Sequence, residues 1–135
     1  MLGKHKGNGF ELLVYKDLMN KPKFKCKRTI GSGSSFEPGD LHLTVISFKE
    51  EYKVHEDFYA IECKHLKKVR YNQLFDFWDK LVKDVDEYNG RFKKEYEPVI
   101  IYRQNNEPIM VMTIGQVKGK FVKTIVSYNI WKQLI

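Results

Sequence analysis

Two charged residues in the first half of the chain have a spacing that suits metal-assisted chemistry. Glu62 and Lys64 flank Cys63 in Phe58–Lys64, a segment rich in β-branched and aromatic residues that we expect to form a strand. Side chains alternate between the faces of a strand, so Glu62 and Lys64 should share one face while Cys63 points to the other. The other Glu-x-Lys triplet, Glu51–Lys53, falls in a charged stretch expected to be a turn. Its position therefore makes Glu62–Lys64 the candidate.

Asp40 opens the preceding expected strand, Asp40–Phe48. An antiparallel hairpin that turns at Glu51 would place Asp40 directly opposite Glu62, with their Cβ atoms roughly 4.5–5.5 Å apart. Two carboxylates at that distance repel each other unless a cation lies between them. The spacing therefore predicts a site for a divalent metal ion.

The chemistry that uses such a set is phosphodiester hydrolysis, which needs an activated water and stabilised charge on the phosphorus oxygens. Asp40 and Glu62 could bind Mg²⁺ or Mn²⁺ together with a backbone carbonyl near Cys63, leaving positions for water and phosphate oxygens. Lys64 could orient the attacking water or neutralise the pentavalent phosphate. Alternatively, Asp40 is a turn residue and Glu62 and Lys64 form a solvated salt bridge, because charged strand faces are common.

A helix near the N-terminus should carry a further acid. Phe10, Leu13, Val14 and Leu18 recur at helical spacing, and Asn8 is a plausible N-cap. Glu11 falls on the border between the core and solvent faces, where it could add a metal ligand or hold a metal-bound water.

The remaining elements suggest how these residues are positioned. Phe24 and Cys26 alternate with lysines in a short strand, and a Gly/Ser loop, Gly31–Gly39, follows. A helix near Tyr71–Tyr88 should end at Asn89-Gly90. Its apolar stripe is Leu74, Trp78, Leu81, Val82, Val85 and Tyr88. The expected later elements are a hairpin of Val99–Tyr102 and Ile109–Thr113, a strand over Phe121–Tyr128 and a short closing helix. This order predicts an α/β fold, a mixed sheet flanked by helices, in a single domain over residues 1–135.

Composition limits the partners. The chain has 135 residues and a net charge of +7, which favours a polyanion such as nucleic acid. No apolar run approaches the ~20 residues of a membrane span, and the first residues do not resemble a secretion signal. The two cysteines, Cys26 and Cys63, form no C-x-x-C pair, and the histidines lack ligand spacing. We therefore expect no structural zinc, no membrane partner and a cytoplasmic location.

Basic residues form three clusters along the chain, which would converge on the candidate site if the hairpin register is right. Each phosphate contact would release counterions and add affinity without reading sequence. A solvated surface that keeps the domain soluble is the alternative. The clusters are Lys4, His5 and Lys6; Lys21, Lys23, Lys25, Lys27 and Arg28; and Lys64, His65, Lys67, Lys68 and Arg70.

Taken in order, several motifs resemble those of the PD-(D/E)XK nuclease superfamily. In the order of the motifs and in size, the chain resembles the small archaeal- and phage-type Holliday junction resolvases. The motifs are Gly7–Glu11, Arg28 with the Gly/Ser loop, Pro38–Asp40 and Glu62–Lys64. The resemblance implies a restriction-endonuclease-like central mixed sheet flanked by helices. It also implies a Mg²⁺- or Mn²⁺-dependent endodeoxyribonuclease, recognising DNA structure more than sequence, that acts in DNA recombination or repair in a bacterial, archaeal or phage-infected cell.

The same resemblance assigns roles to individual residues. Glu11 matches a helix-borne acid, Asp40 and Glu62 match metal ligands, and Lys64 matches the catalytic lysine. Ser32 falls in the loop near the scissile phosphate, with Ser34 and Ser35 as alternatives. Gln73 matches a glutamine on the helix after the lysine, although it could equally be an ordinary helix-surface amide. The 21 residues between Asp40 and Glu62 exceed the expected length, which weakens the case for junction specificity.

Two other functions remain open: a restriction- or repair-type nuclease acting on other duplex or flapped DNA, and a nucleic-acid-binding module that does not cut. The intact set of charged residues argues against the second, because clustered charge is costly without a function. A junction resolvase must make two symmetric cuts, so we expect an isologous dimer. The candidate contact residues are Ile109, Met110, Met112, Ile130, Trp131, Leu134 and Ile135. Alternatively, this tail packs on its own sheet.

Overall fold

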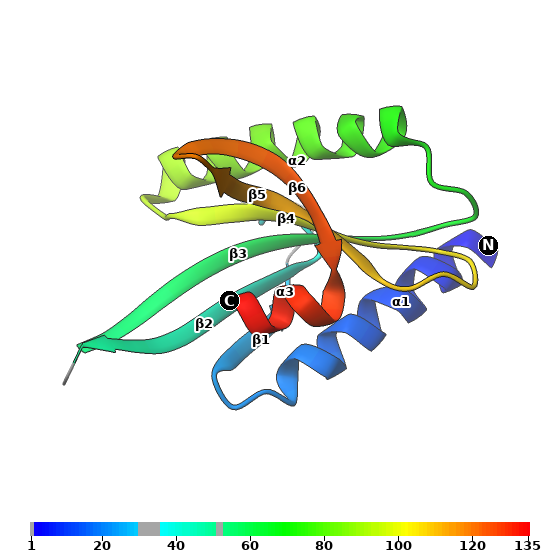
Figure 1. Cartoon of the computed structure of the whole chain (residues 1–135). Coiled ribbons are helices and arrows are strands. Elements are labelled where there is room, and N and C mark those ends of the chain that lie inside the picture. The colour runs from blue at the N-terminus through cyan, green and yellow to red at the C-terminus, as the bar shows by residue number, and fades with distance from the viewer. Residues whose placement is uncertain (1, 30–35, 51–52) are drawn as a thin grey trace.

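Strand order in the sheet follows the order of the chain in the computed structural model, which describes residues 2–29, 36–50 and 53–135 (Figure 1). Within these residues, six strands pair in the order β1-β2-β3-β4-β5-β6. Neighbours are antiparallel except β3 and β4, which are parallel. The strands are β1 (Phe24–Arg28), β2 (Leu41–Glu50), β3 (Lys53–Leu66), β4 (Tyr96–Gln104), β5 (Met110–Val117) and β6 (Lys120–Ser127).

Three helices in the described part of the chain cover the two faces of this sheet. Helix α2 (Tyr71–Phe92) packs on one face, and α1 (Leu2–Met19) and α3 (Tyr128–Leu134) pack on the other (Figure 1). Parallel strands need a crossover connection, and α2 provides it between β3 and β4. The predicted mixed sheet flanked by helices is therefore confirmed. None of these helices is both long and apolar enough to cross a bilayer.

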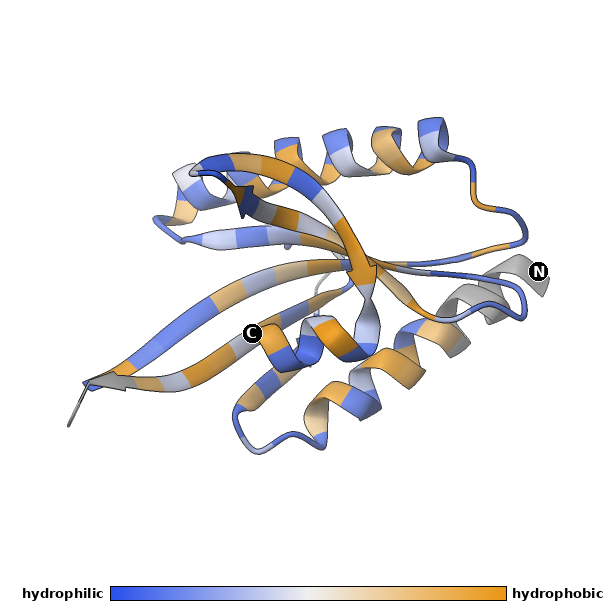
Figure 2. Ribbon diagram, in the orientation of Figure 1, coloured by the Kyte–Doolittle hydropathy of each residue, from blue (hydrophilic) through white to orange (hydrophobic). Residues whose placement is uncertain are grey.

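Alternation along the central strands divides the core into two layers (Figure 2). Ile61 and Cys63 of β3 pack in the layer under α1 and α3, whereas Ala60 packs in the layer under α2. The second layer contains Leu74, Trp78, Leu81, Val85, Ile100, Tyr102 and Met112. Glu62 and Lys64 share the α2 side with Ala60, so the predicted separation of Cys63 from these two residues is confirmed.

Helix α1 differs from its prediction in two ways. It begins at Leu2, so Asn8 lies inside the helix and does not cap it. Phe10, Val14 and Leu18 are buried as predicted, but Leu13 is 46% exposed. The narrow i, i+4, i+8 stripe is enough to contact the sheet, and Leu13 lies beside it.

Helix α2 continues through Asn89-Gly90 to Phe92, so the predicted end was wrong. The side chain of Asn89 explains the difference: it donates to Tyr96 O at 2.9 Å and accepts from Tyr96 N–H at 3.0 Å. Asn89 thus anchors the start of β4. The helix ends instead at Lys93, whose left-handed backbone (φ 53°) lets its N–H donate to Asn89 O.

The far end of the β2–β3 hairpin extends beyond the neighbouring strands. β1 pairs with Leu41–Val45 only, and β4 pairs with β3 from Phe58 onward. Residues 46–48 and 54–57, which we call the hairpin arm, therefore project from the body of the sheet (Figure 1). Phe48 in this arm is 77% exposed and pairs with the exposed Val54.

The C-terminal tail packs on its own sheet, as the alternative interpretation held. Tyr128 and Trp131 are buried against the core under α1. The Tyr128 hydroxyl donates to Asp17 Oδ2 at 2.7 Å, and Lys132 Nζ donates to the same atom at 2.8 Å. These contacts fix α3 to α1 on the same face of the sheet.

Candidate functional site

The β2–β3 register brings Asp40 alongside Glu62. Leu41 pairs with Ile61, which is the register expected from a turn at Glu51. Asp40 N–H donates to Ile61 O at 2.7 Å, and Cys63 N–H donates to Asp40 Oδ2 at 2.8 Å. The first bond fixes the backbone of Asp40 against β3, and the second fixes its carboxylate beside Glu62 and Lys64.

Gly39 makes this close approach possible. Its φ of +79° lies in the left-handed region, and a Cβ at this position would be 2.7 Å from Ile61 O. Thr29 reinforces the turn from the side of β1: its hydroxyl donates to Gly39 O at 2.6 Å, and its N–H donates to Asp40 O at 3.0 Å. Any other residue at Gly39 would displace Asp40 from Cys63.

The two carboxylates create the electrostatic environment of a cation site. Burial, and then the charge of Glu62, raise the pKa of Asp40 to about 6, although Cys63 N–H and Lys64 act in the opposite direction. No cluster of three or more His, Cys, Asp or Glu side chains suited to a metal occurs among the described residues. Two carboxylates still fit Mg²⁺, which is often bound by one or two carboxylates and keeps several waters.

Lys64 lies between an aromatic ring on α2 and the carboxylates of Asp40 and Glu62, which we call the acidic pair. Its Nζ is 3.5 Å from Glu62 Oε1 and 4.3 Å from the centre of the Phe77 ring on α2. Together these side chains border a cleft of about 320 Å³ between the sheet and α2. The cleft is lined by Phe36, Gly39, Asp40, Glu62, Lys64, Phe77, Lys80, Leu81 and Asp84. An ammonium group beside two carboxylates that could hold a metal suits the stabilisation of an anionic phosphate.

Glu11 lies near the pair but binds an arginine. Arg28 Nη2 is 3.3 Å from Glu11 Oε2. Burial raises the pKa of Glu11, and the charge of Asp40 raises it further against the opposing effect of Arg28. Glu11 does not line the cleft. Glu11 was predicted to bind metal and Arg28 to bind DNA, but in the structure their charges neutralise each other.

A buried group that the sequence did not reveal supports the turn before Asp40. Glu37 is 7% exposed and accepts from Lys27 Nζ at 2.6 Å, and its Oε2 lies 3.7 Å from His42 Nδ1. His42, 3% exposed, lies with Nε2 2.9 Å from Pro38 O, so this nitrogen carries the proton. We call Lys27, Glu37 and His42 the buried clasp, after its two buried members, Glu37 and His42; Lys27 reaches Glu37 from the surface. The histidines were considered from the sequence only as metal ligands, so the role of His42 in this turn was not predicted.

Burial also lowers the pKa of His42, and two tyrosine rings explain why. The ring centres of Tyr96 and Tyr88 lie 4.3 and 5.9 Å from that of His42. Within the described residues His42 Nδ1 has no hydrogen-bond partner. A neutral His42 therefore holds Pro38 through one nitrogen and faces the Glu37 carboxylate with the other.

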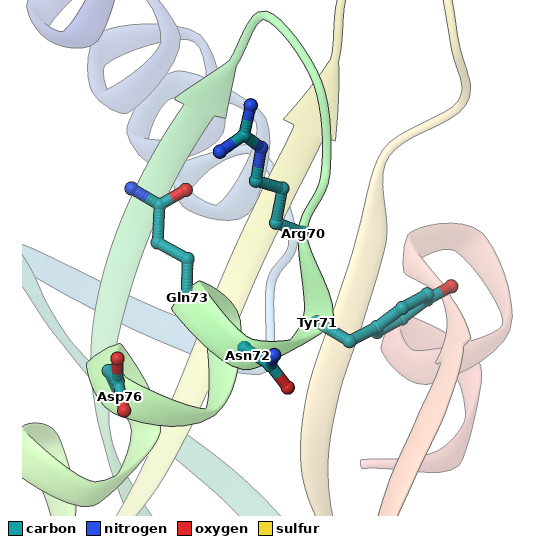
Figure 3. Close-up of a pocket in the computed structure, with 5 residues that line it drawn as sticks. All are labelled: Arg70, Tyr71, Asn72, Gln73 and Asp76. Atoms are coloured by element: carbon teal, nitrogen blue, oxygen red, sulfur yellow. The ribbon is translucent and has the colours of Figure 1, made fainter.

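Basic and polar residues predicted to bind DNA gather at the start of α2. Lys67, Lys68, Arg70 and Gln73 are exposed. They border adjoining hollows of about 640 and 820 Å³. In Figure 3, Arg70 and Gln73 extend to the same side of the helix N-terminus, whereas Tyr71 points away. Lys25 is also exposed, on β1. These side chains can reach phosphates, whereas Lys27 and Arg28 hold acidic partners.

Three predicted residues cannot be compared with the structure. Ser32 and Ser34 lie outside the described residues, as does the alternative Ser35. The backbone of Lys6 belongs to α1, but its side chain also lies outside the described part.

Comparison with known proteins identifies one family, and four chains among the solved structures match. A family model described as "Phage putative PDDEXK endonuclease" matches residues 3–133. Among solved structures, the chain is similar to Hjc of Archaeoglobus fulgidus, a Holliday junction resolvase from an archaeal hyperthermophile. The identity is 16%, 94% of this chain and 93% of that chain are covered, and the TM-score is 0.49. No curated protein matches the chain.

Proposed function

This chain belongs to the family of phage PDDEXK endonucleases, and on that premise we propose that it hydrolyses DNA phosphodiester bonds with a divalent metal ion held by Asp40 and Glu62. One observation carries the proposal: Cys63 N–H holds Asp40 Oδ2 at 2.8 Å, beside Glu62 and Lys64 in one cleft. Mg²⁺ or Mn²⁺ suits these oxygen ligands, and the carbonyl of Cys63 is a further candidate.

Each residue of the cleft has a distinct task in this mechanism. A bound metal would polarise the phosphate and lower the pKa of a coordinated water. Asp40 and Glu62 supply its ligands, and the buried clasp and Gly39 keep Asp40 in place. Lys64 neutralises charge on the phosphate oxygens or orients the attacking water. Phe77 lies against Lys64 and limits the directions in which its ammonium group can point.

The DNA surface supports recognition of structure more than of sequence. The exposed residues at the start of α2, Lys67, Lys68, Arg70 and Gln73, suit contacts with phosphates, which fix position without reading bases. Together with the ordered sequence motifs, this favours branched DNA such as a Holliday junction as the substrate. Other duplex or flapped DNA is the alternative substrate, and binding without cutting is the alternative function.

A resolvase of this kind would act as an isologous dimer, but the predicted contact residues need revision. Trp131 and Met112 are buried within the chain. A different exposed apolar patch lies where α2 meets the edge of the sheet: Lys123 Nζ lies 4.9 Å from the centre of the Phe75 ring, and Lys123 pairs with Ile114. The dimer patch, as we call it, comprises Phe75, Ile114, Phe121 and Ile125, all exposed. A second copy could cover it.

The decisive experiment compares cleavage of four-way, flapped, duplex and single-stranded DNA with Mg²⁺ and with EDTA. We expect cutting with Mg²⁺ only, and faster cutting of branched DNA. Ca²⁺ should permit binding without cutting. Cleavage that persists in EDTA would refute the metal mechanism, and binding without any cleavage would favour the non-cutting module.

A further inference from the structure

A second, smaller pocket opens beside the cleft along α2. Its volume is about 190 Å³, and it is lined by Phe36, Asp84, Glu87, Tyr88, Arg91 and Phe92. Phe36 and Asp84 also line the cleft that contains Asp40, Glu62 and Lys64. The two hollows therefore adjoin, so a DNA strand in the cleft would lie beside the smaller one. We call the smaller one the aromatic pocket.

Aromatic side chains from distant parts of the chain form its walls. Phe36 precedes β2 and is 44% exposed, and Phe92 ends α2 and is 41% exposed. The ring of Tyr88 lies next to Phe92, with centres 4.8 Å apart. Exposed phenyl groups on both sides of a pocket beside a charged cleft leave apolar surface in water. A flat aromatic ligand would cover that surface.

The polar groups of the pocket suit a nucleobase better than a phosphate. Asp84 and Glu87 offer carboxylate oxygens, which accept hydrogen bonds from exocyclic amino groups and repel phosphate. Arg91 lies over the Phe92 ring, 5.3 Å from its centre, where its guanidinium can stack on a base or contact the backbone at the rim. The two carboxylates and the guanidinium therefore suit one nucleotide whose base enters the aromatic pocket.

We propose that the aromatic pocket binds one unpaired base of the DNA strand that lies in the cleft, next to the scissile phosphate. This inference rests on the proposed function and narrows its substrate class. A base in continuous duplex is already stacked and paired, so entering the pocket would require flipping, which costs free energy. An unpaired base at a flap, bulge or opened branch point enters without that cost. Bases with an exocyclic amino group, adenine, cytosine and guanine, should bind better than thymine.

The test uses the full chain with Ca²⁺ and DNA carrying the fluorescent base 2-aminopurine at successive positions around a bulge or a flap junction. Stacking in the pocket should quench or shift the fluorescence at one position only. Phe36→Ala and Phe92→Ala should each abolish this change and weaken binding to bulged DNA on the order of tenfold. Phe92 does not line the cleft, so Phe92→Ala should leave duplex binding unchanged. Phe92→Trp should retain both.

Phe48→Ala is the matched control, because Phe48 is an exposed phenylalanine on the hairpin arm, away from both hollows. Thermal unfolding of each variant separates loss of the pocket from loss of the fold. The inference is overturned if both alanine variants bind bulged and duplex DNA as the wild type does, or if no position responds. Failure of the proposed function would look different: no DNA would be cut with Mg²⁺, whatever the fluorescence shows.

Discussion

Lys27 Nζ lies 2.6 Å from Glu37 Oε2 and thereby joins β1 to the turn that carries Asp40. Lys27 lies in a run of basic residues that suggested DNA contact, yet its partner is a buried carboxylate. The hydrogen bond to Glu37 is the main reason that the pKa of Lys27 is raised. Lys27 therefore acts on the site through the protein, by positioning the residues before Asp40.

Lys27→Met should reduce metal affinity and cleavage by roughly 10–100-fold, as loss of support for a metal ligand does in other sites. It leaves the Glu37 carboxylate without that partner, so the free energy of unfolding should fall by about 1–3 kcal/mol. Calorimetry with Mn²⁺ and urea unfolding measure the two effects. Lys25→Met, on the same strand and likewise exposed but outside the contact with Glu37, is the control and should affect DNA binding only. Equal metal affinity in both variants would contradict the positioning role, and Lys27→Arg should restore it.

The raised pKa of Asp40 predicts how the metal-free stability depends on pH. Because its folded pKa of about 6 exceeds the ordinary value of 3.8, the folded chain binds this proton more tightly than the unfolded chain does. The stability that this proton contributes to the folded chain is complete below pH 3.8 and is lost as the pH rises through about 6. Asp40→Asn, which removes the charge, should therefore stabilise the metal-free protein at about pH 8 by up to about 3 kcal/mol and have little effect at about pH 3.5.

With metal bound, the wild type should become more stable relative to Asp40→Asn than it is without metal. In urea unfolding at about pH 8, Mg²⁺ should stabilise the wild type and leave Asp40→Asn unchanged, because only the wild type has both carboxylates. For the wild type, metal affinity should drop roughly tenfold per pH unit below about pH 6, as Asp40 becomes protonated. Calorimetry that finds the same Mn²⁺ affinity in Asp40→Asn would remove Asp40 from the ligand set.

Lys64→Ala should slow cleavage by roughly 10²-fold or more, the scale of losing one electrostatic stabiliser, while DNA affinity changes little. Single-turnover kinetics and a binding titration in Ca²⁺ separate the two quantities. Lys83→Ala, an exposed lysine on α2 that does not line the cleft, is the control. A Lys64 variant that loses binding and cleavage in equal proportion would make Lys64 a phosphate-binding residue without a special role in the reaction.

Replacing Lys67, Lys68 and Arg70 together by glutamine should weaken DNA binding and flatten its salt dependence, by a slope of about 0.9 for each phosphate that the variant no longer neutralises. The same change at Lys25, Lys27 and Arg28 should flatten the slope less, because two of those three already hold carboxylates. Titrations at several salt concentrations provide the slopes. If the first triple variant keeps the wild-type slope, the start of α2 does not face DNA.

Light scattering should show a dimer at micromolar concentration, and Phe121→Glu in the dimer patch should convert it to a monomer. Leu134→Glu, at an equally exposed position of the tail (both 73%), should leave the dimer intact. If the wild type is a monomer and remains one per four-way junction when bound, the resolvase function is removed. Activity as a general nuclease would still stand.

The hairpin register could be predicted from sequence because one rule determines it. Strand alternation and a charged turn placed Asp40 beside Glu62, and the observed pairs follow that register. The local sequence pattern could not show which partner, brought close by folding, a polar side chain would bind. Asn89 binds Tyr96 where it was expected to end α2, and Arg28 binds Glu11 where it was expected to bind DNA.

The aromatic pocket and the buried clasp were missed for the same physical reason. Phe36 and Phe92 come from distant segments, and no periodicity joins them. Glu37 and His42 flank the Pro38–Asp40 motif, but only the folded chain shows that Lys27 reaches Glu37 and that Pro38 O meets the imidazole. The sequence predicted contacts within one helix, one strand or one hairpin, and it did not predict contacts that depend on tertiary packing between distant segments.

The hairpin arm can vary in length without disturbing the candidate site at the base of its two strands. Asp40 and Glu62 lie at the base of the two strands, while Phe48 and Val54 pair well beyond the support of β1 and β4. Adding or deleting one residue in each strand near the tip, in matched pairs, would change the reach of the arm and leave the register at its base intact. The arm can therefore lengthen or shorten during evolution without moving the acidic pair. The sequence distance between the two acids is then a poor guide to whether related proteins share the same chemistry.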